Sequence, residues 1–233
     1  MIPLTFSVGL STLKTAMNLY AQQRCYFERA YETGEHGWPT TEPTPFVVQS
    51  IRKLLRQGEL QRKGRVLDLG CGEGRHTFAC AELGLTAIGL DYQSLAITRA
   101  RSMPKARRLR QDTLFLVGDA FHLPFRSGIF DLIMDCGCFH HVKKPDTARY
   151  LKSVIPLLIP GGHFILSCFS WRFRHYPGER RRRDWLVHRG HYDRFFTKPY
   201  FFKIFGDWFD ILRIEEEREG LYAFYQVLMR KRR

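Results

Sequence analysis

Short apolar runs alternate with amphipathic segments through the middle of the chain. The apolar runs are nearly continuous, as is typical of strands that are buried on both faces of a parallel sheet. The intervening segments space their apolar residues as helices do, which predicts right-handed strand–helix–strand crossovers with helices on both faces. Strands are expected at 65–69, 86–91, 113–119, 130–135 and 162–169, and helices at 75–83, from the turn after 91 to about 101, and at 147–158.

The two ends of the chain follow a different pattern. Apolar residues at helical spacing predict one helix over residues 10–30 and a second over 45–57, where Pro45 suits the first turn and Gly58 the stop. After 169 the sequence becomes basic, aromatic and irregular until about 195, which predicts an insertion or lid. A short helix at 197–205 and two strands joined through Gly220 then predict an antiparallel hairpin at the edge of the sheet.

Length and composition suit one domain of 233 residues with 44% hydrophobic content. We expect N-terminal helices and a lid in 1–60, a cofactor-binding core in 65–169, a basic insertion in 170–195, and the last helix with the terminal hairpin in 196–233. The N-terminus is only mildly apolar, so a signal peptide or a membrane span is not favoured. The six cysteines do not have the spacing of a disulfide framework, which predicts reduced thiols and a cytoplasmic protein.

A glycine-rich stretch, VLDLGCGEGRHT, provides the strongest functional signal. A strand ends, Gly70, Gly72 and Gly74 follow, and a helix begins. Glycine permits the tight turn and lets a ligand approach the backbone closely, and the helix N-terminus offers free amides. A glycine turn that merely packs a helix on a strand is the alternative, and the acidic residues that follow argue against it.

Acidic residues stand at the ends of successive predicted strands. Asp91 follows the glycine loop by about twenty residues, where a carboxylate accepts hydrogen bonds from ribose hydroxyls in a doubly wound fold. Asp119 ends the next strand, where an acid would meet an adenine amino group. Asp68 precedes the loop and would repel a phosphate, yet it would suit a ligand with an ammonium and a sulfonium. The pattern therefore favours S-adenosylmethionine over NAD, although a nucleotide-dependent dehydrogenase remains a rival.

With these motifs in place, the chain resembles the class I S-adenosylmethionine-dependent methyltransferases over about residues 65–169. The resemblance implies a seven-stranded, Rossmann-like sheet of order 3-2-1-4-5-7-6 with strand 7 antiparallel. It also implies that the loop glycines and Asp68 hold the methionine end, Asp91 the ribose, and Asp119 with Ala120 the adenine. Asp135 would lie beside the methyl group. Neighbouring residues are included as expected cofactor contacts: Cys71, Tyr92 and Phe121.

A closer resemblance links the chain to the small-molecule branch of thiopurine, thiol and tellurite-resistance type methyltransferases. The stretch YETGEHGW, ending at Trp38, is similar to a segment that precedes the core in that branch. DCGCFHHV, beginning at Asp135, is similar to its pattern after strand 4. The resemblance implies a small-molecule acceptor, with Trp38 as a further cofactor contact. It does not explain the basic insertion; separately, we expect residues 25–45 and 170–195 to form a lid over the acceptor.

The cluster DCGCFHH also allows other interpretations. Its Cys-x-Cys followed by adjacent histidines is poorly spaced for zinc, so no metal is expected. A cysteine nucleophile beside a histidine remains open, without the proline that the RNA cytosine methyltransferases carry. We expect His140 or His141 to act as a general base, together with Asp135 at the end of the fourth strand, although either histidine could only shape the loop.

The chain is strongly basic, with 37 Lys and Arg against 23 Asp and Glu, a formal net charge of +14. Basic segments at 105–110, 180–183 and 230–233 would suit a nucleic-acid surface. However, no Pro-Pro-aromatic follows Asp135, as it does in amino-directed nucleic-acid methyltransferases. Methylation of a small-molecule S, O or N acceptor is therefore favoured, with an RNA or protein methyltransferase as the alternative and a non-catalytic cofactor-binding protein as a further rival. The oligomeric state is not predicted.

Overall fold

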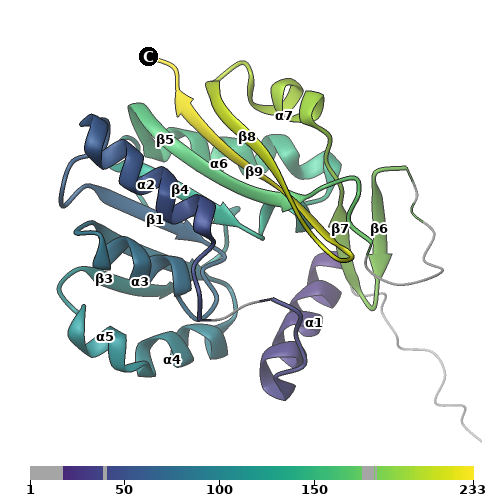
Figure 1. Ribbon diagram of the computed structural model, residues 1–233. Helices are drawn as coiled ribbons and strands as arrows, with labels where there is room; N and C mark the ends of the chain where they lie inside the picture. Colours follow the sequence, from purple (N-terminus) through teal and green to yellow (C-terminus); the bar gives the residue numbers. More distant parts are fainter. Residues whose placement is uncertain (1–17, 39–40, 175–180, 182) are drawn as a thin grey trace, which may run out of the picture.

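Seven strands form one sheet in the computed structural model, in the order β3-β2-β1-β4-β5-β9-β8 (Figure 1). β1 to β5 run parallel, β9 pairs antiparallel with β5, and β8 pairs antiparallel with β9. This confirms the predicted order, with its antiparallel strand beside the fifth. The strands are β1 (Arg65–Leu69), β2 (Thr86–Asp91), β3 (Thr113–Val117), β4 (Phe130–Cys136), β5 (Leu158–Phe169), β8 (Phe209–Glu219) and β9 (Tyr222–Lys231).

The structure describes residues 18–38, 41–174, 181 and 183–233. Part of the predicted first helix, residues 10–17, lies outside this range. The same is true of Tyr176 in the predicted lid and of Arg180 and Arg182 in the arginine run.

Most helices follow the predicted segments, but the helix predicted over 147–158 ends at Val154 and β5 begins at Leu158, four residues before its predicted start. α2 covers Pro45–Gln57 as expected, because proline begins it and Gly58, at φ 73°, ends it in the left-handed region. α1 begins at Leu19, where the Asn18 side chain accepts a hydrogen bond from the Ala21 amide, and it continues to Thr33. The other helices are α3 (Arg75–Glu82), α4 (Ser94–Ser102), α5 (Pro104–Arg108), α6 (Thr147–Val154) and α7 (Lys198–Phe205), with 3-10 turns η1 (Phe139–His141), η2 (Lys144–Asp146) and η3 (Ile155–Leu157). α5 was not predicted.

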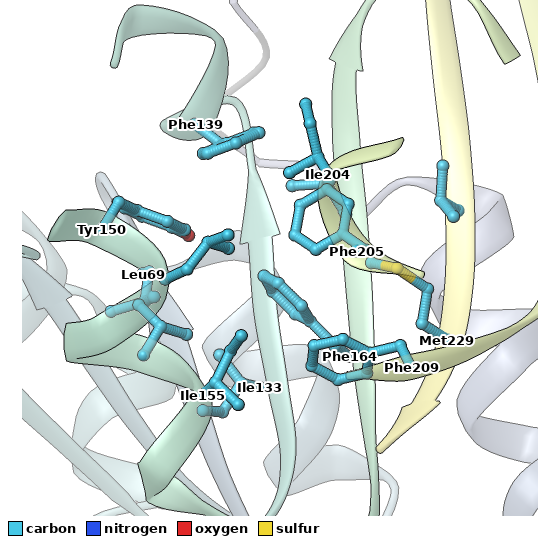
Figure 2. Packing of buried hydrophobic residues seen from close by; sticks show 14 of the residues in the cluster. Leu69, Ile133, Phe139, Tyr150, Ile155, Phe164, Ile204, Phe205, Phe209 and Met229 are labelled. Atoms are coloured by element: carbon cyan, nitrogen blue, oxygen red, sulfur yellow. The ribbon is translucent and has the colours of Figure 1, made fainter. Parts of the chain in front are cut away.

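The central strands of the sheet are buried on both faces, because consecutive residues of one strand enter opposite cores. On β5, Phe164 packs into the core beneath α6 and α7, whereas Ile165 packs beneath α2 and α3. Figure 2 shows the first of these cores, in which Phe164 of β5, Phe205 of α7 and Phe209 of β8 lie close together. A firm sheet of this kind fixes the strand ends that carry the candidate site.

The predicted irregular insertion instead contains a second, two-stranded sheet of β6 (Trp185–His188) and β7 (His191–Arg194). His188 pairs with His191, so only Arg189 and Gly190 form the turn, and both have positive φ, at 47° and 87°. Such a two-residue turn matches the twist of a hairpin. The expectation of an irregular segment was therefore wrong over these residues, because the charges around the hairpin hide its short alternating pattern.

Within the described ranges, no helix has both the length and the apolar character needed to cross a membrane.

Candidate active site

The glycine loop joins β1 to α3 with all three glycines in the left-handed region, at φ 66°, 55° and 85° for Gly70, Gly72 and Gly74. A Cβ added at Gly72 would lie 2.8 Å from the Tyr31 hydroxyl, and one at Gly70 would lie 2.8 Å from Cys138 Cβ. The loop thus touches α1 on one side and the DCGCFHH turn on the other. Glycine is required here both by backbone conformation and by close packing.

Asp68 lies beneath this loop rather than on its surface. Its Oδ2 accepts a 2.7 Å hydrogen bond from the Thr77 hydroxyl in α3, and the residue is 1% exposed. Burial raises the pKa of Asp68 to about 7, against the opposing effects of Thr77 and Arg75. Cys71 is likewise buried, and its amide donates to the Leu90 carbonyl. Both residues therefore support the loop from below in this structure.

Asp91 ends β2 and holds the loop from the other side. Its Oδ2 accepts from the Gly72 amide at 2.9 Å and its Oδ1 from the Gln93 amide at 2.8 Å. Each carboxylate oxygen keeps a lone-pair direction for a further donor, which is what two vicinal hydroxyl groups require. Burial raises the pKa of Asp91, opposed by these backbone donors. Asp91 therefore lies at the strand end where the sequence predicted a ribose-binding acid.

An arginine that the sequence did not single out links the next two predicted positions. The Arg24 guanidinium from α1 lies 4.8 Å from the centre of the Tyr92 ring and 3.7 Å from Asp119 Oδ2. Asp119 lies two residues beyond the end of β3, so that strand is shorter than predicted, and Asp119 Oδ1 accepts from the Phe121 amide at 2.9 Å. Ala120 and Phe121 are half-buried beside it. The structure brings Tyr92 and Asp119 together at one edge.

Asp135 organises the turn that follows β4. Its Oδ1 accepts from the amides of Cys138 and Phe139, both at 2.9 Å, and its Oδ2 accepts from the Tyr150 hydroxyl at 2.6 Å. The residue is fully buried, and burial raises its pKa, opposed first by the Tyr150 hydrogen bond. Three donors on a carboxylate with no exposed surface fix the position of η1 relative to the glycine loop.

The two adjacent histidines of η1 lie in different environments. His140 is 2% exposed, its ring stacks on Phe169 at 3.7 Å, and it hydrogen-bonds the backbone of Ser167. Burial lowers the pKa of His140 well below its usual value, with neighbouring His141 adding to the effect. His140 is thus a neutral packing residue in this structure.

The His141 side chain is 14% exposed and contacts the β6–β7 hairpin. Its Nδ1 lies 2.9 Å from the Tyr192 carbonyl oxygen and 3.1 Å from Asp193 Oδ1. Asp193 Oδ2 in turn lies 3.0 Å from His191 Nε2. Burial alone would raise the pKa of Asp193, but the two histidines outweigh it and hold that pKa below its usual range. Sequence analysis missed Asp193, and only an alternating WLVH–RG–HYDR pattern pointed to a hairpin there.

We call α1 and the β6–β7 hairpin together the lid. In Figure 1 both lie at the end of the sheet toward which β1 and β4 point. The Gln23 side chain joins them, since its Oε1 accepts from the Tyr192 amide at 3.1 Å and its Nε2 donates to the His141 carbonyl at 3.4 Å. Because α1 begins at Leu19 and Gln23 already contacts the hairpin, the lid begins before residue 25, where it was predicted to start.

An aromatic cluster lines the inner side of α1. The Phe27 ring lies 5.0 Å from the His141 ring, 6.3 Å from Tyr92 and 5.7 Å from Trp38. Trp38 also stacks on His36 at 4.4 Å. His141, Tyr92 and Trp38 therefore all surround the Phe27 ring.

Two other sequence expectations concern metals and nucleic acids. Among the described residues, no group of three or more His, Cys, Asp or Glu has an arrangement suited to a metal ion. The basic segments make local ion pairs: Arg108 and Lys105 with Glu82 at 2.6 and 3.6 Å, and Arg232 with Asp210 at 3.0 Å. These pairings give no special support to a phosphate-binding surface.

Comparison with known proteins supports the resemblance to methyltransferases. Residues 66–162 match the family model described as a methyltransferase domain. The chain is 34% identical over 133 residues to the 2-heptyl-1-hydroxyquinolin-4(1H)-one methyltransferase of Mycobacteroides abscessus, a match that covers 57% of this chain and 56% of that protein. It is 30% identical over 132 residues to an uncharacterised methyltransferase of Schizosaccharomyces pombe, covering 55% of this chain and 88% of that protein.

The first curated relatives are longer than the matched region, since the chain covers between 36% and 56% of the length of the first three. Among solved structures, the Burkholderia thailandensis 1,6-didemethyltoxoflavin-N1-methyltransferase, with bound 1,6-didemethyltoxoflavin and S-adenosylhomocysteine, aligns with a TM-score of 0.72 and 24% identity. That alignment covers 92% of this chain and 89% of the other. Together with the glycine loop and the strand order, these matches show that the chain belongs to the class I S-adenosylmethionine-dependent methyltransferase family.

Proposed function

We propose that this protein transfers a methyl group from S-adenosylmethionine to an ionisable O–H or N–H group of a small, planar aromatic acceptor. The observation that supports this most directly is the position of His141, whose ring stands among Phe27, Phe169 and His140. Flat apolar walls around one ionisable group suit a flat acceptor with one exchangeable proton.

The residues of the sheet edge fit the cofactor. Asp91 would accept from the ribose hydroxyls, and Asp119 with Ala120 and Phe121 would flank the adenine. The three loop glycines leave no side chain between the backbone and the methionine end, and no basic residue stands on the loop turn itself before Arg75. Bound S-adenosylmethionine would supply an electrophilic methyl group on a sulfonium.

Asp68, Cys71 and Asp135 would support the cofactor indirectly. Each is buried. Asp68 accepts a hydrogen bond from Thr77, and Asp135 accepts from Tyr150 and from the amides of Cys138 and Phe139. We therefore propose that Asp135 positions η1 rather than exchanging protons with the acceptor. Trp38 would help to close the site through its contact with Phe27.

His141 would remove the acceptor proton, and His140 would hold the turn. The Tyr192 carbonyl can only accept a hydrogen bond, so the neutral His141 ring carries its hydrogen on Nδ1 and leaves the Nε2 lone pair available. The apolar rings would exclude water from a reaction in which the positive charge on sulfur is lost.

The names of one relative, a 2-heptyl-1-hydroxyquinolin-4(1H)-one methyltransferase, and of one protein of similar fold, a 1,6-didemethyltoxoflavin-N1-methyltransferase, are consistent with this acceptor class. The test is methyl transfer from labelled cofactor to a panel of phenols, hydroxyquinolines, heteroaromatic N–H compounds, thiols and RNA. We expect label on aromatic O–H or N–H acceptors and its near loss in His141→Gln. Label confined to thiols or RNA would contradict the proposal.

A further inference from the structure

We propose that Asp193 of the lid hairpin is a positioning residue for His141, so that the lid completes a carboxylate–histidine pair when it covers the acceptor. This inference deepens the proposed function and rests on it, because it assigns the partner of the proposed base. Its basis is the geometry at His141 Nδ1, which faces the Tyr192 carbonyl oxygen at 2.9 Å and Asp193 Oδ1 at 3.1 Å.

Asp193 is held as a charged group in a buried position. It is 1% exposed, and His191 Nε2 lies 3.0 Å from its Oδ2. Tyr26 of α1 stacks on the His191 ring at 4.0 Å, which braces that contact from outside. Burial of a carboxylate is costly, and the contacts of Asp193 with His191 and His141 offset that cost here.

The other carboxylate oxygen has capacity to spare. Among the described residues, no hydrogen bond reaches Asp193 Oδ1, although that atom is buried and lies 3.1 Å from His141 Nδ1. In the neutral state, the hydrogen on Nδ1 is directed to the Tyr192 carbonyl. An imidazolium at His141 would turn this contact into an ion pair, which is strong in a low-dielectric site.

The alternation of the strand explains how one hairpin supplies these groups. His191 and Asp193 are two residues apart on β7 and therefore share one face, while the carbonyl of Tyr192 between them lies at the edge toward η1. Gln23 of α1 fixes the Tyr192 amide at 3.1 Å. The hairpin thus presents a carbonyl and a carboxylate to the same ring nitrogen.

The proton balance is simple. The acceptor proton moves from oxygen or nitrogen to His141 Nε2, while the acceptor lone pair forms the new bond to carbon and the carbon–sulfur bond breaks toward sulfur. Asp193 remains ionised throughout and stabilises the imidazolium, which later returns its proton to water. The largest benefit is expected for acceptors that hold their proton tightly.

The experiment compares Asp193→Asn with wild type on substituted phenols of graded acidity, from 4-nitrophenol to 4-methoxyphenol. We expect turnover to fall on the order of 10²-fold for the least acidic phenols and little for 4-nitrophenol, with the affinity for S-adenosylhomocysteine unchanged. Asp184→Asn is the matched control, because this carboxylate precedes the same hairpin but pairs with Lys144 at 2.7 Å. An equal loss on every phenol would overturn the proposal.

A second measurement does not depend on turnover. In wild-type protein with ¹⁵N-labelled histidine, assigned with His141→Gln, NMR should show His141 protonated on Nδ1, and this proton resonance should move in Asp193→Asn but not in Asp184→Asn. An unmoved resonance would overturn the pairing. If wild type methylates none of the phenols, hydroxyquinolines or heteroaromatic N–H compounds of the acceptor panel while the resonance moves as expected, the proposed function fails and the pairing stands.

Discussion

The two sides of the candidate site are built in different ways. On the sheet side, Asp91 and the glycine loop are held by amides of neighbouring turns that follow directly from strand ends. On the lid side, His141 depends on Gln23 and Asp193, from segments far away in sequence. The cofactor side is thus fixed by local backbone, whereas the acceptor side is assembled by long-range contacts. A family can keep the first while varying the second.

The largest expected effect separates the two histidines of the lid side. His141→Gln should lower turnover by about 10²–10⁴-fold, which is the usual rate contribution of a general base, and should leave cofactor affinity unchanged. His140→Gln should instead lower thermal stability, because it disturbs a buried stack on Phe169. Steady-state kinetics and thermal melts of both variants provide the measurement. Equal losses of turnover would erase the distinction between them.

A pH effect on the sheet side should come next in size. Burial raises the pKa of Asp68 to about 7 in the folded protein, so folding favours its protonated form. This contribution to stability is complete below about pH 4 and is lost as pH rises toward 7, at roughly 1.4 kcal/mol per pKa unit. Asp68→Asn stays neutral and keeps an acceptor for Thr77. Its free energy of unfolding, measured by denaturant at several pH values, should therefore rise relative to wild type between pH 4 and 7; parallel curves would refute the assignment.

The ribose assignment predicts a smaller change on the same side. Asp91→Ala should weaken cofactor binding by about 1.5–3 kcal/mol, measured by calorimetry, because a charged acceptor is lost. Asp112→Ala is the control, since this acid precedes β3 and pairs with Lys63 at 2.6 Å. Unchanged affinity in Asp91→Ala would leave the sheet side without its main polar contact.

The smallest prediction concerns the docking of α1. The Tyr20 hydroxyl donates to Asp146 Oδ2 at 2.8 Å and accepts from the Lys143 amide at 3.1 Å. Tyr20→Phe should cost about 0.5–1.5 kcal/mol and speed hydrogen exchange in α1 without affecting exchange in the sheet. If hydrogen exchange rises in the sheet as well, α1 does not unfold separately from the sheet, and the distinction between the lid side and the sheet side is contradicted.

Sequence patterns predicted the sheet side well because its signals are local. β1 and β2 have the expected bounds, since each is an apolar run ended by glycine or aspartate, and α2 is bracketed by Pro45 and Gly58. The lid side was predicted poorly. Nothing near Arg24 shows that it will reach Asp119, and nothing near Asp193 shows that it will meet His141. Those contacts are long-range tertiary contacts, which form only in the folded protein.

One contact of the lid has a kinetic consequence. Gln93, two residues after the proposed ribose acid, donates its side-chain amide to the Arg24 carbonyl at 2.7 Å, and Asp91 is left 8% exposed. The same helix therefore covers the place where cofactor and product would have to pass. With the ribose at Asp91, as proposed, exchange of one for the other would require α1 to undock, and the residence time of the product, rather than the chemical step, would then limit the rate of repeated turnovers.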